Sequence, residues 1–257
     1  MRFARPQPSS GRRLSARRAL LAIWARRGDP HLRLQVALAA LFGAALWAFG
    51  HIVEDYLTGD PLVRWDVELG RWLHEHSNPT LISVFDVFTF AGSIPVLALA
   101  TVAAALYLLR RGHLSEASLL CIAAVGIEIL YPILKLLFHR PRPVLAYAHL
   151  DTYSFPSGHA AGSAAVYGLA LYFLARYARP RWQVVAAVGY AVLVVSIGFS
   201  RLYLEVHYLS DVLAGISLGA AWAIAALFVY EWRHDVVTRL LPERLRGAAN
   251  GFRTSRS

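Results

Sequence analysis

The stretch from Ser200 to Asp211 concentrates reactive side chains between two long apolar runs of the sequence. His207 and Asp211 are four residues apart, so on a helix they would share one face within side-chain reach. A carboxylate placed in this way fixes the tautomer of an imidazole and stabilises its charged form. Arg201 adds a planar fork of donors suited to an oxyanion such as phosphate. The stretch therefore predicts phosphoryl transfer, and the alternative is a polar helix end at a membrane surface.

A second group of polar residues follows an earlier apolar run. Lys135 is the only lysine in a chain that otherwise uses arginine, which favours a position that needs a compact ammonium; chance retention is the alternative. Pro141 and Pro143 end the helix and stiffen the loop after it. We therefore expect the loop to hold Arg140 and Arg142 at the membrane surface.

A third segment, Pro156-Ser157-Gly158-His159, precedes a run of small residues at 160–165. Ser157 and Gly158 stand where a helix begins, so they can offer a hydroxyl and backbone N–H groups to an anion. An ordinary serine N-cap is an equally good interpretation of Ser157. His159 would open the helix, where it can donate a proton to a leaving oxygen. The small residues predict close helix packing.

Together, the three segments resemble the type 2 phosphatidic acid phosphatase superfamily. That family is marked by Lys-x6-Arg-Pro, then Pro-Ser-Gly-His, then Ser-Arg-x5-His-x3-Asp. All three patterns occur here in order and without substitution, starting at Lys135, Pro156 and Ser200. The signature and the spans between its parts cover roughly residues 115–230.

The resemblance implies a mechanism and a set of site residues. His207 would attack phosphorus to form a phosphohistidine, with Asp211 orienting it. His159 would protonate the leaving group and then activate the hydrolytic water. The phosphoryl oxygens would be held by Lys135, Arg142, Ser157, the Gly158 backbone and Arg201, with Arg140 and Ser200 as supporting residues. Such a cationic cradle can position and neutralise a phosphoryl group without a metal. No acidic cluster stands near the motifs, so we expect no metal and no cofactor.

The composition predicts an all-α, polytopic membrane protein. Of 257 residues, 57% are hydrophobic, which is too apolar for an ordinary soluble domain and enough for several membrane spans. The formal charge of +10 comes from basic residues between apolar runs and at both ends, which favours topology signals and lipid contacts over nucleic acid binding. The single cysteine, Cys121, excludes a disulfide framework and a cysteine metal site.

Six apolar segments predict a bundle of six transmembrane helices, at residues 34–53, 81–109, 114–138, 159–178, 182–199 and 210–232. The second span should bend near Pro95. We interpret Glu128, in the third span, as a structural hydrogen-bonding group. Within residues 54–79, apolar side chains recur at helical spacing and predict an interfacial amphipathic helix: Leu62, Trp65, Leu69, Trp72 and Leu73.

The chain is expected to have three regions: a basic arm at 1–33, a six-span phosphatase domain at 34–232 and a basic tail at 233–257. A cleaved signal peptide is not expected, because the first 30 residues lack a compact apolar core followed by small residues. With the amino terminus in the cytoplasm, both tails and the other arginine-rich turns lie inside. The motif segments then share the extracytoplasmic face of the cytoplasmic membrane.

The predicted function is hydrolysis of a lipid phosphate or diphosphate at that face. The resemblance implies undecaprenyl diphosphate, phosphatidic acid or phosphatidylglycerol phosphate, and the first is favoured because its recycling requires an extracytoplasmic site. The partners are then the substrate, a phospholipid or polyprenyl phosphate, and the bilayer, with no nucleic acid. A lipid phosphotransferase using the same histidine is the first alternative. A transporter is the second, supported by Asp86 and Glu128 inside spans, but the sequence shows no inverted repeat.

Overall fold

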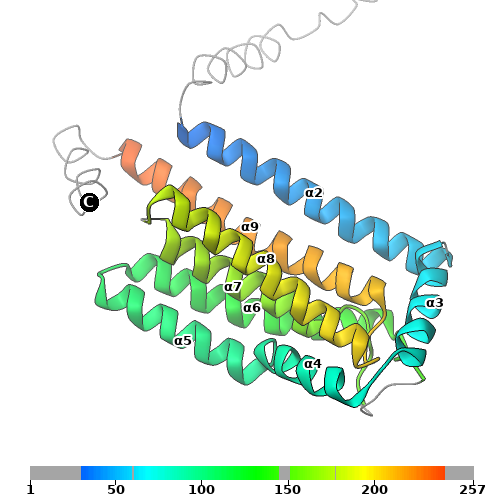
Figure 1. Cartoon of the computed structure of the whole chain (residues 1–257). Coiled ribbons are helices and arrows are strands. Elements are labelled where there is room, and N and C mark those ends of the chain that lie inside the picture. Colours follow the sequence, from blue (N-terminus) through cyan, green and yellow to red (C-terminus); the bar gives the residue numbers. More distant parts are fainter. Residues whose placement is uncertain (1–29, 60, 145–150, 177, 241–257) are drawn as a thin grey trace, which may run out of the picture. The chain divides into compact units, whose positions relative to one another are not determined.

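The computed structural model describes residues 30–59, 61–144, 151–176 and 178–240 of the chain. Most of the basic arm, most of the basic tail and part of the loop after Pro143 lie outside these residues. The described helices are labelled in Figure 1. In chain order they are α2 (Pro30–Thr58), α3 (Pro61–Glu75), α4 (Pro79–Ala91), α5 (Ile94–Arg110), α6 (Leu114–Phe138), α7 (Gly158–Ala175), α8 (Pro180–Tyr203) and α9 (Leu209–Leu240).

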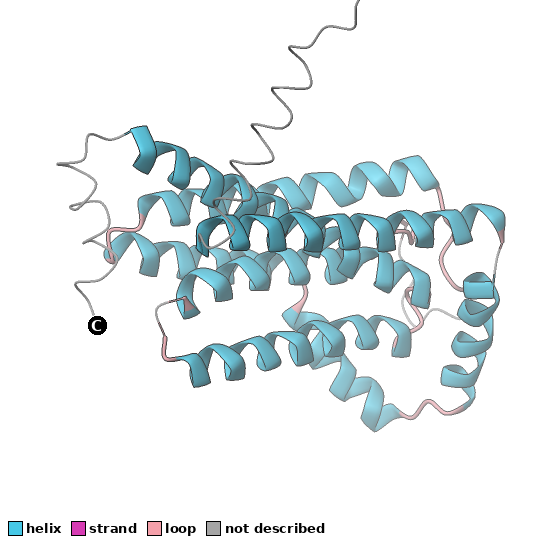
Figure 2. Ribbon diagram, turned by 90° about the horizontal axis from the view of Figure 1, so that it is seen from above, coloured by secondary structure: helices cyan, strands magenta, loops and turns pink. Residues whose placement is uncertain are grey.

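The described ranges contain helices and loops but no β-strand, as Figure 2 shows, and this confirms the all-helical class. The chain forms two compact units. One comprises residues 39–230 and contains every motif residue, and the other is formed by the segments on either side of it. The site described below therefore belongs entirely to the unit 39–230.

Several helices are suited to a bilayer. Four are individually long and apolar enough to cross one: His31–Thr58, Leu114–Phe138, Pro180–Tyr203 and Leu209–Arg233. The pair formed by α4 and α5 adds a fifth if it is counted as one broken span. The protein is therefore a multi-pass membrane protein with four to five such spans among its described residues. The remaining predicted span corresponds to α7, which does not meet the same test, so the count of six stays a prediction.

The predicted bend in the second span is confirmed. The axes of α4 and α5 differ by 45°, and the break lies at Gly92 and Ser93. Pro95 sits in the first turn of α5, where a helix does not need the missing N–H. A Cβ added to Gly92 would lie 2.5 Å from Cγ2 of Ile197 and 3.3 Å from Cδ2 of His159. Glycine therefore lets the break approach α7 and α8 closely.

Helix α7 is surrounded by protein. It packs against α5, α6 and α8, and its residues Ala160 to Val166 are all buried. A Cβ added to Gly219 of α9 would lie 2.2 Å from the carbonyl oxygen of Ala161, so α9 also approaches its backbone. The predicted close packing of the small-residue run is thus confirmed. A helix enclosed by protein does not need the apolar surface of a lipid-facing helix.

The other helices expose apolar side chains on the outside of the bundle. Leu99 of α5 is 68% exposed, Leu136 of α6 is 64% exposed and Val195 of α8 is 62% exposed. Large aliphatic groups exposed on successive helices are expected where lipid, not water, surrounds the protein. Glu128 accepts a hydrogen bond from Tyr131 at 3.0 Å, as predicted for a structural group inside the bundle.

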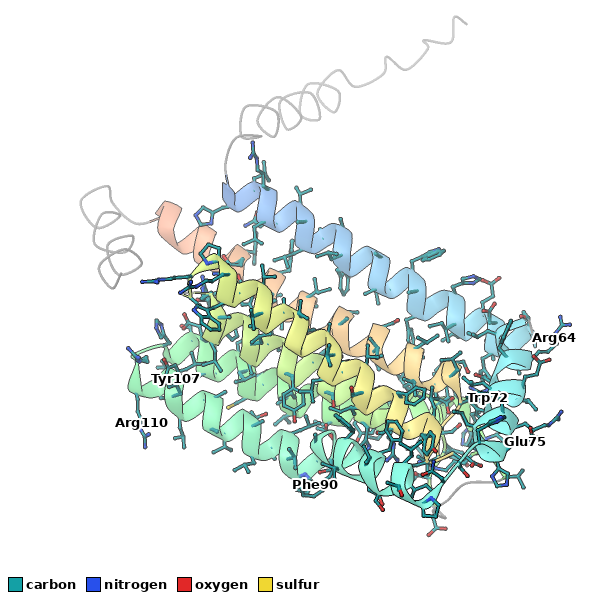
Figure 3. All side chains as sticks on the ribbon, viewed as in Figure 1. Arg64, Trp72, Glu75, Phe90, Tyr107 and Arg110 are labelled. Atoms are coloured by element: carbon teal, nitrogen blue, oxygen red, sulfur yellow. The ribbon has the colours of Figure 1, made fainter. Side chains whose placement is uncertain are left out.

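Helix α3 crosses one end of the bundle (Figure 1). Figure 3 shows Glu75 of α3 at this end and Arg110 of α5 at the opposite end. Only part of the predicted apolar face of α3 packs against the protein. Trp65 and Trp72 are 62% and 54% exposed, whereas Asp66 and Leu73 are 2% and 3% exposed. An acidic residue, Asp66, therefore lies beside Leu73 on the side of α3 that packs against the protein.

We predict that Gly219→Ala destabilises the protein, because the added methyl group overlaps the carbonyl oxygen of Ala161. Overpacking of this kind costs about 1–3 kcal/mol. The thermal unfolding midpoint in detergent should fall measurably. Gly189→Ala in α8 is the matched control, since nothing lies within 4 Å of its added Cβ. Equal midpoints for the two variants would contradict the close approach of α7 and α9.

Candidate active site

The three motif segments meet at the same end of the bundle as α3. Lys135, in the last turn of α6, donates a hydrogen bond from Nζ to the carbonyl oxygen of Ser154 at 3.2 Å. Arg142, in the loop after α6, donates from Nη1 to the carbonyl oxygen of Val206 at 2.7 Å. The backbone N–H of Ser157 donates to the carbonyl oxygen of Asp211 at 2.9 Å. These bonds join residues that are up to 64 positions apart in the sequence.

His207 contacts Asp211, but not from the helix face that the spacing suggested. α8 ends at Tyr203 and α9 begins at Leu209, so His207 lies in the turn between them. The chain reverses at Glu205, whose φ of 54° is in the left-handed region. Nδ1 of His207 lies 3.2 Å from Oδ2 of Asp211. The prediction of the contact is confirmed, while that of one shared helix is wrong.

The start of α9 fixes the carboxylate in this position. Asp211 is the third residue of α9, and its Oδ2 accepts a hydrogen bond from the backbone N–H of Tyr208 at 3.0 Å. This is the reach-back half of a capping box, in which an acid in the first turn binds the N-cap N–H. A negative side chain is also favoured near a helix amino terminus.

The contacts of the His207 ring indicate which of its nitrogens carries the proton. With Asp211 at Nδ1, the proton belongs on Nδ1 and the lone pair on Nε2. Nη1 of Arg142 lies 3.4 Å from Nε2, consistent with an acceptor at that atom. Burial lowers the pKa of His207 well below its usual value, and nearby cations lower it further: Arg201, Lys135 and Arg142. These effects favour the neutral imidazole, which is the form that a nucleophile requires.

Backbone carbonyl groups anchor two of the cations. Nζ of Lys135 donates to the carbonyl oxygens of Tyr153 and Ser154. Arg142 donates from Nε to the carbonyl oxygen of Thr152 at 2.7 Å and from Nη2 to Oγ1 of the same residue at 2.8 Å. Carbonyl dipoles hold the positive groups in place without neutralising them. The charge thus stays available to an anion.

Two buried donors at the site have no protein partner. Ser157 is 0% exposed and is the N-cap residue of α7, yet its hydroxyl makes no capping bond. Its Oγ and the Nε of Arg201 are among the buried polar atoms without a partner in the described part of the chain. Arg201 is held by a bond from Nη1 to Oγ1 of Thr89. Leaving a buried donor unpaired is costly, so each such group calls for an explanation. A bound oxyanion would satisfy both.

Gly158 and His159 begin α7 beside these groups. A Cβ added to Gly158 would lie 2.6 Å from Cε2 of Tyr131, so the helix start can approach α6 only with glycine. His159 lies close enough to Arg201 and His207 for their charges to act on it. The structure thus brings together all five predicted phosphate-binding residues and both histidines.

Arg140 and Ser200 have different contacts from those expected. Arg140 does not extend towards an anion: Nη1 donates to Oδ1 of Asp211 at 2.6 Å, and Nη2 donates to Oδ2 of Asp66 at 2.7 Å. The guanidinium group of Arg140 is therefore occupied by hydrogen bonds to the carboxylates of Asp211 and Asp66. Ser200 is 0% exposed, and its Oγ donates to the carbonyl oxygen of Ile197 at 2.7 Å. Neither residue supports an anion directly in this geometry.

Sequence reasoning missed Asp66, although its position held a usable signal. Leu62, Asp66, Leu69 and Leu73 follow one another at helical spacing, so Asp66 falls in line with the apolar face of α3. An acid in such a line has to be paired if the face is buried. Thr89 of α4, which holds Arg201, belongs to no motif and carries no comparable signal.

A cavity of about 240 Å³ lies between α3 and the turn that carries His207. Leu69, Leu73 and Leu202 contribute to its mostly apolar wall, and His207 borders it. None of the predicted phosphate-binding residues lines it. The cavity therefore adjoins His207 but is separate from the cationic cradle. Among the described residues, no three His, Cys, Asp or Glu side chains gather as a metal site would require.

Comparisons with known proteins agree with the motifs. Residues 116–235, which include all of the motif residues, match the family described as the PAP2 superfamily. Phosphatidylglycerophosphatase B of Bacillus subtilis (strain 168) is 39% identical over 97 residues, which cover 36% of this chain and 47% of that protein. The match thus spans about half the length of this curated relative.

Two crystal structures have a similar fold. One is described as the first transmembrane PAP2 type phosphatidylglycerolphosphate phosphatase from Bacillus subtilis; its TM-score is 0.63 at 25% identity, covering 76% of this chain and 96% of that one. The other is Aquifex aeolicus LpxE, with a TM-score of 0.52 at 25% identity, covering 63% of this chain and 94% of that one.

We predict that the cradle binds a free tetrahedral oxyanion and that Arg201→Gln weakens this binding. Loss of one charge-assisted hydrogen bond is worth about 1.5–3 kcal/mol, or roughly tenfold or more in affinity. Calorimetric titration of orthovanadate into the detergent-purified protein measures it. Arg64→Gln is the control, because Arg64 points away from the bundle on α3 (Figure 3). Equal affinities for the wild type and Arg201→Gln would contradict the assigned cradle.

Proposed function

We propose that this chain, of which residues 116–235 match the PAP2 superfamily, is an integral-membrane lipid phosphatase that works through a phosphohistidine at His207. The observation that carries the proposal is the buried pair of His207 and Asp211 beside a cationic cradle with unpartnered donors. Such an arrangement places a neutral nucleophile next to groups that bind and neutralise phosphoryl oxygens.

The reaction proceeds in two displacements. In the first, Nε2 of His207 attacks phosphorus, the bond to the lipid oxygen breaks, and His159 gives that oxygen a proton. Asp211 accepts the Nδ1–H bond and stabilises the positive charge that develops on the ring. In the second, His159 removes a proton from water, the water oxygen attacks phosphorus, and inorganic phosphate leaves as His207 becomes neutral again. Throughout, the oxygens are held by Lys135, Arg142, Ser157, Gly158 and Arg201.

Phosphatidylglycerol phosphate is the first substrate to consider. The curated relative and one of the similar crystal structures, both from Bacillus subtilis, bear the name of a phosphatase for this lipid. The exposed apolar sides of the bundle suit a substrate that arrives through the membrane. This ranks it ahead of undecaprenyl diphosphate, which the sequence alone favoured. Phosphatidic acid is the third candidate.

The proposed topology has six spans, with α7 as the short fourth one. Its 18 residues form a helix about 27 Å long, close to the roughly 30 Å of a hydrocarbon core. The site end of the bundle faces out of the cytoplasm, and the turn at Arg110 and Arg111 faces in. α3 lies at the outer interface, where exposed Trp65 and Trp72 suit the headgroup region. Basic regions at 1–33 and 233–257 then flank the domain at 34–232 on the cytoplasmic side of the inner membrane.

We predict that His207→Ala abolishes phosphate release, because no other group can take the place of the nucleophile. The loss should be about 10³-fold or more. Phosphate release from the three lipids is measured in detergent with EDTA present, and the wild type is expected to retain activity. His51→Ala serves as the control, since that ring is 55% exposed on α2. Full activity in His207→Ala would refute the mechanism.

The same assay separates hydrolysis from transfer. With a lipid alcohol added, a hydrolase releases inorganic phosphate at an unchanged rate. A phosphotransferase instead forms the phosphorylated alcohol at the expense of free phosphate.

Rapid-quench labelling of the protein with ³²P substrate tests the covalent intermediate. The label should survive alkali and be lost in acid, as expected for a phosphohistidine.

We predict opposite accessibility for the two ends of the bundle. Asp151→Cys, in the loop between α6 and α7, should react with an impermeant maleimide in intact cells. Arg111→Cys should react only after lysis. Both are made in a Cys121→Ser background, because Cys121 is exposed. Labelling of Arg111→Cys in intact cells would reverse the proposed orientation.

A further inference from the structure

Asp66 lies outside every motif, yet it is bonded to the residues that hold the nucleophile. We propose that Asp66 and Arg140 are positioning residues, which hold Asp211 in place and set the net charge that it presents to His207. The inference rests on the proposed function, since it concerns the reactivity of His207.

A continuous chain of contacts leads from α3 to the nucleophile. Oδ2 of Asp66 accepts a bond from Nη2 of Arg140 at 2.7 Å. Nη1 of Arg140 donates to Oδ1 of Asp211 at 2.6 Å. Oδ2 of Asp211 lies 3.2 Å from Nδ1 of His207. The two oxygens of Asp211 are thus divided between Arg140 and the nucleophile, so a change in one bond acts directly on the other.

Asp66 also fixes the backbone beside the orienting acid. Its Oδ1 accepts a bond from the backbone N–H of Ser210 at 2.8 Å, and its Oδ2 accepts the hydroxyl of the same residue. Ser210 precedes Asp211 at the start of α9. One side chain of α3 therefore satisfies a free N–H of α9 and holds the first turn from which Asp211 projects.

Water is excluded from this network. Asp66 is 2% exposed, Arg140 4% and Asp211 0%. The guanidinium of Arg140 lies 4.3 Å from the ring centre of Tyr208 and 4.8 Å from that of Tyr56. Charges shielded from solvent in this way interact far more strongly than a surface ion pair. Each charge that is removed leaves its partner buried without compensation.

The charges of the network predict how each substitution acts on His207. Burial opposes the charge of Arg140, but the carboxylates of Asp211 and Asp66 outweigh it and raise the pKa of Arg140. One positive and two negative groups leave one net negative charge beside the imidazole. Without Asp66, the remaining pair of Arg140 and Asp211 has no net charge, so the protonated form of His207 is less stabilised. Without Arg140, two carboxylates remain, so the protonated form of His207 is more stabilised.

Other charged groups around His207 come from the remaining elements and stay constant in these variants. They are Lys135 of α6, Arg142 of the loop, His159 of α7 and Arg201 of α8. Their contribution cancels when the variants are compared with the wild type. Any difference in the titration of His207 is then caused by the network itself.

The test compares Asp66→Asn, Arg140→Gln and the double variant in the pH dependence of kcat/KM. Asp66→Asn should move the acid limb to lower pH by about one unit, the size expected for one buried charge at several ångströms. It should lower kcat by about tenfold, as loss of an outer orienting partner does, with KM within about twofold of the wild type. Arg140→Gln should move the limb to higher pH. The double variant keeps one net negative charge, so its limb should return to the wild-type position.

A purely structural clamp gives a different pattern, since both single variants would lose activity without opposite shifts of the limb. Shifts in one direction, or no shift, overturn the proposal. Glu68→Gln is the matched control, because Glu68 is exposed two positions after Asp66 on the same helix. If Arg140→Gln does not fold, the shift of Asp66→Asn relative to Glu68→Gln decides.

A second readout needs no activity. The ¹⁵N imidazole signal of His207 is identified by its loss in His207→Gln and is then titrated in each variant. The same opposite shifts are expected, and their absence overturns the proposal. A wild type that titrates as expected but releases no phosphate would refute the proposed function and leave the positioning network standing.

Discussion

The contact between His207 and Asp211 works only while both groups stay dry and aligned, and much of the surrounding structure maintains that condition. His207 lies in a short turn, so no helix of its own holds it. Its position depends on the end of α8, where the N–H groups of Val206 and His207 donate to the carbonyl oxygen of Arg201. It depends equally on the start of α9, which carries Asp211. The pair of His207 and Asp211 is thus assembled between two helix ends, where unpaired backbone groups are available to bind it.

Close packing around α7 makes this assembly possible. The backbone of α9 at Gly219 is in close contact with that of α7 at Ala161. A Cβ added to Gly215 would lie 2.5 Å from the carbonyl oxygen of Ser157. Larger residues would separate α7 from α9, and therefore Ser157 and Gly158 at the start of α7 from Asp211 in the first turn of α9. The small residues therefore serve the site as well as the bundle, because distances within the site follow directly from distances between helix axes.

The sequence predicts the elements well and the contacts of individual polar groups less well. The bounds of α6 and the bend near Pro95 follow from apolar length and proline chemistry, which act locally. The motif residues follow from their spacing. By contrast, the hydroxyl of Ser157 makes no N-cap hydrogen bond, and Arg140 binds the carboxylates of the protein instead of facing a phosphoryl group. The contacts of Arg140 depend on Asp66 and Asp211, which are 74 and 71 positions away in the sequence, and local spacing carries no information about such partners.

Under the proposed function, the distribution of charge explains how binding energy is used. The cations of the site divide into two groups. Arg140 is balanced by carboxylates, so it can shape the nucleophile but adds little attraction for the substrate. Lys135, Arg142 and Arg201 are held by carbonyl and hydroxyl oxygens, which position a charge without cancelling it. The negative charge that balances these three cations is supplied by the phosphoryl group, whose charge spreads over its oxygens in the transition state. Attraction is therefore concentrated on the reacting group, and discrimination between lipids falls to surfaces beyond the cradle.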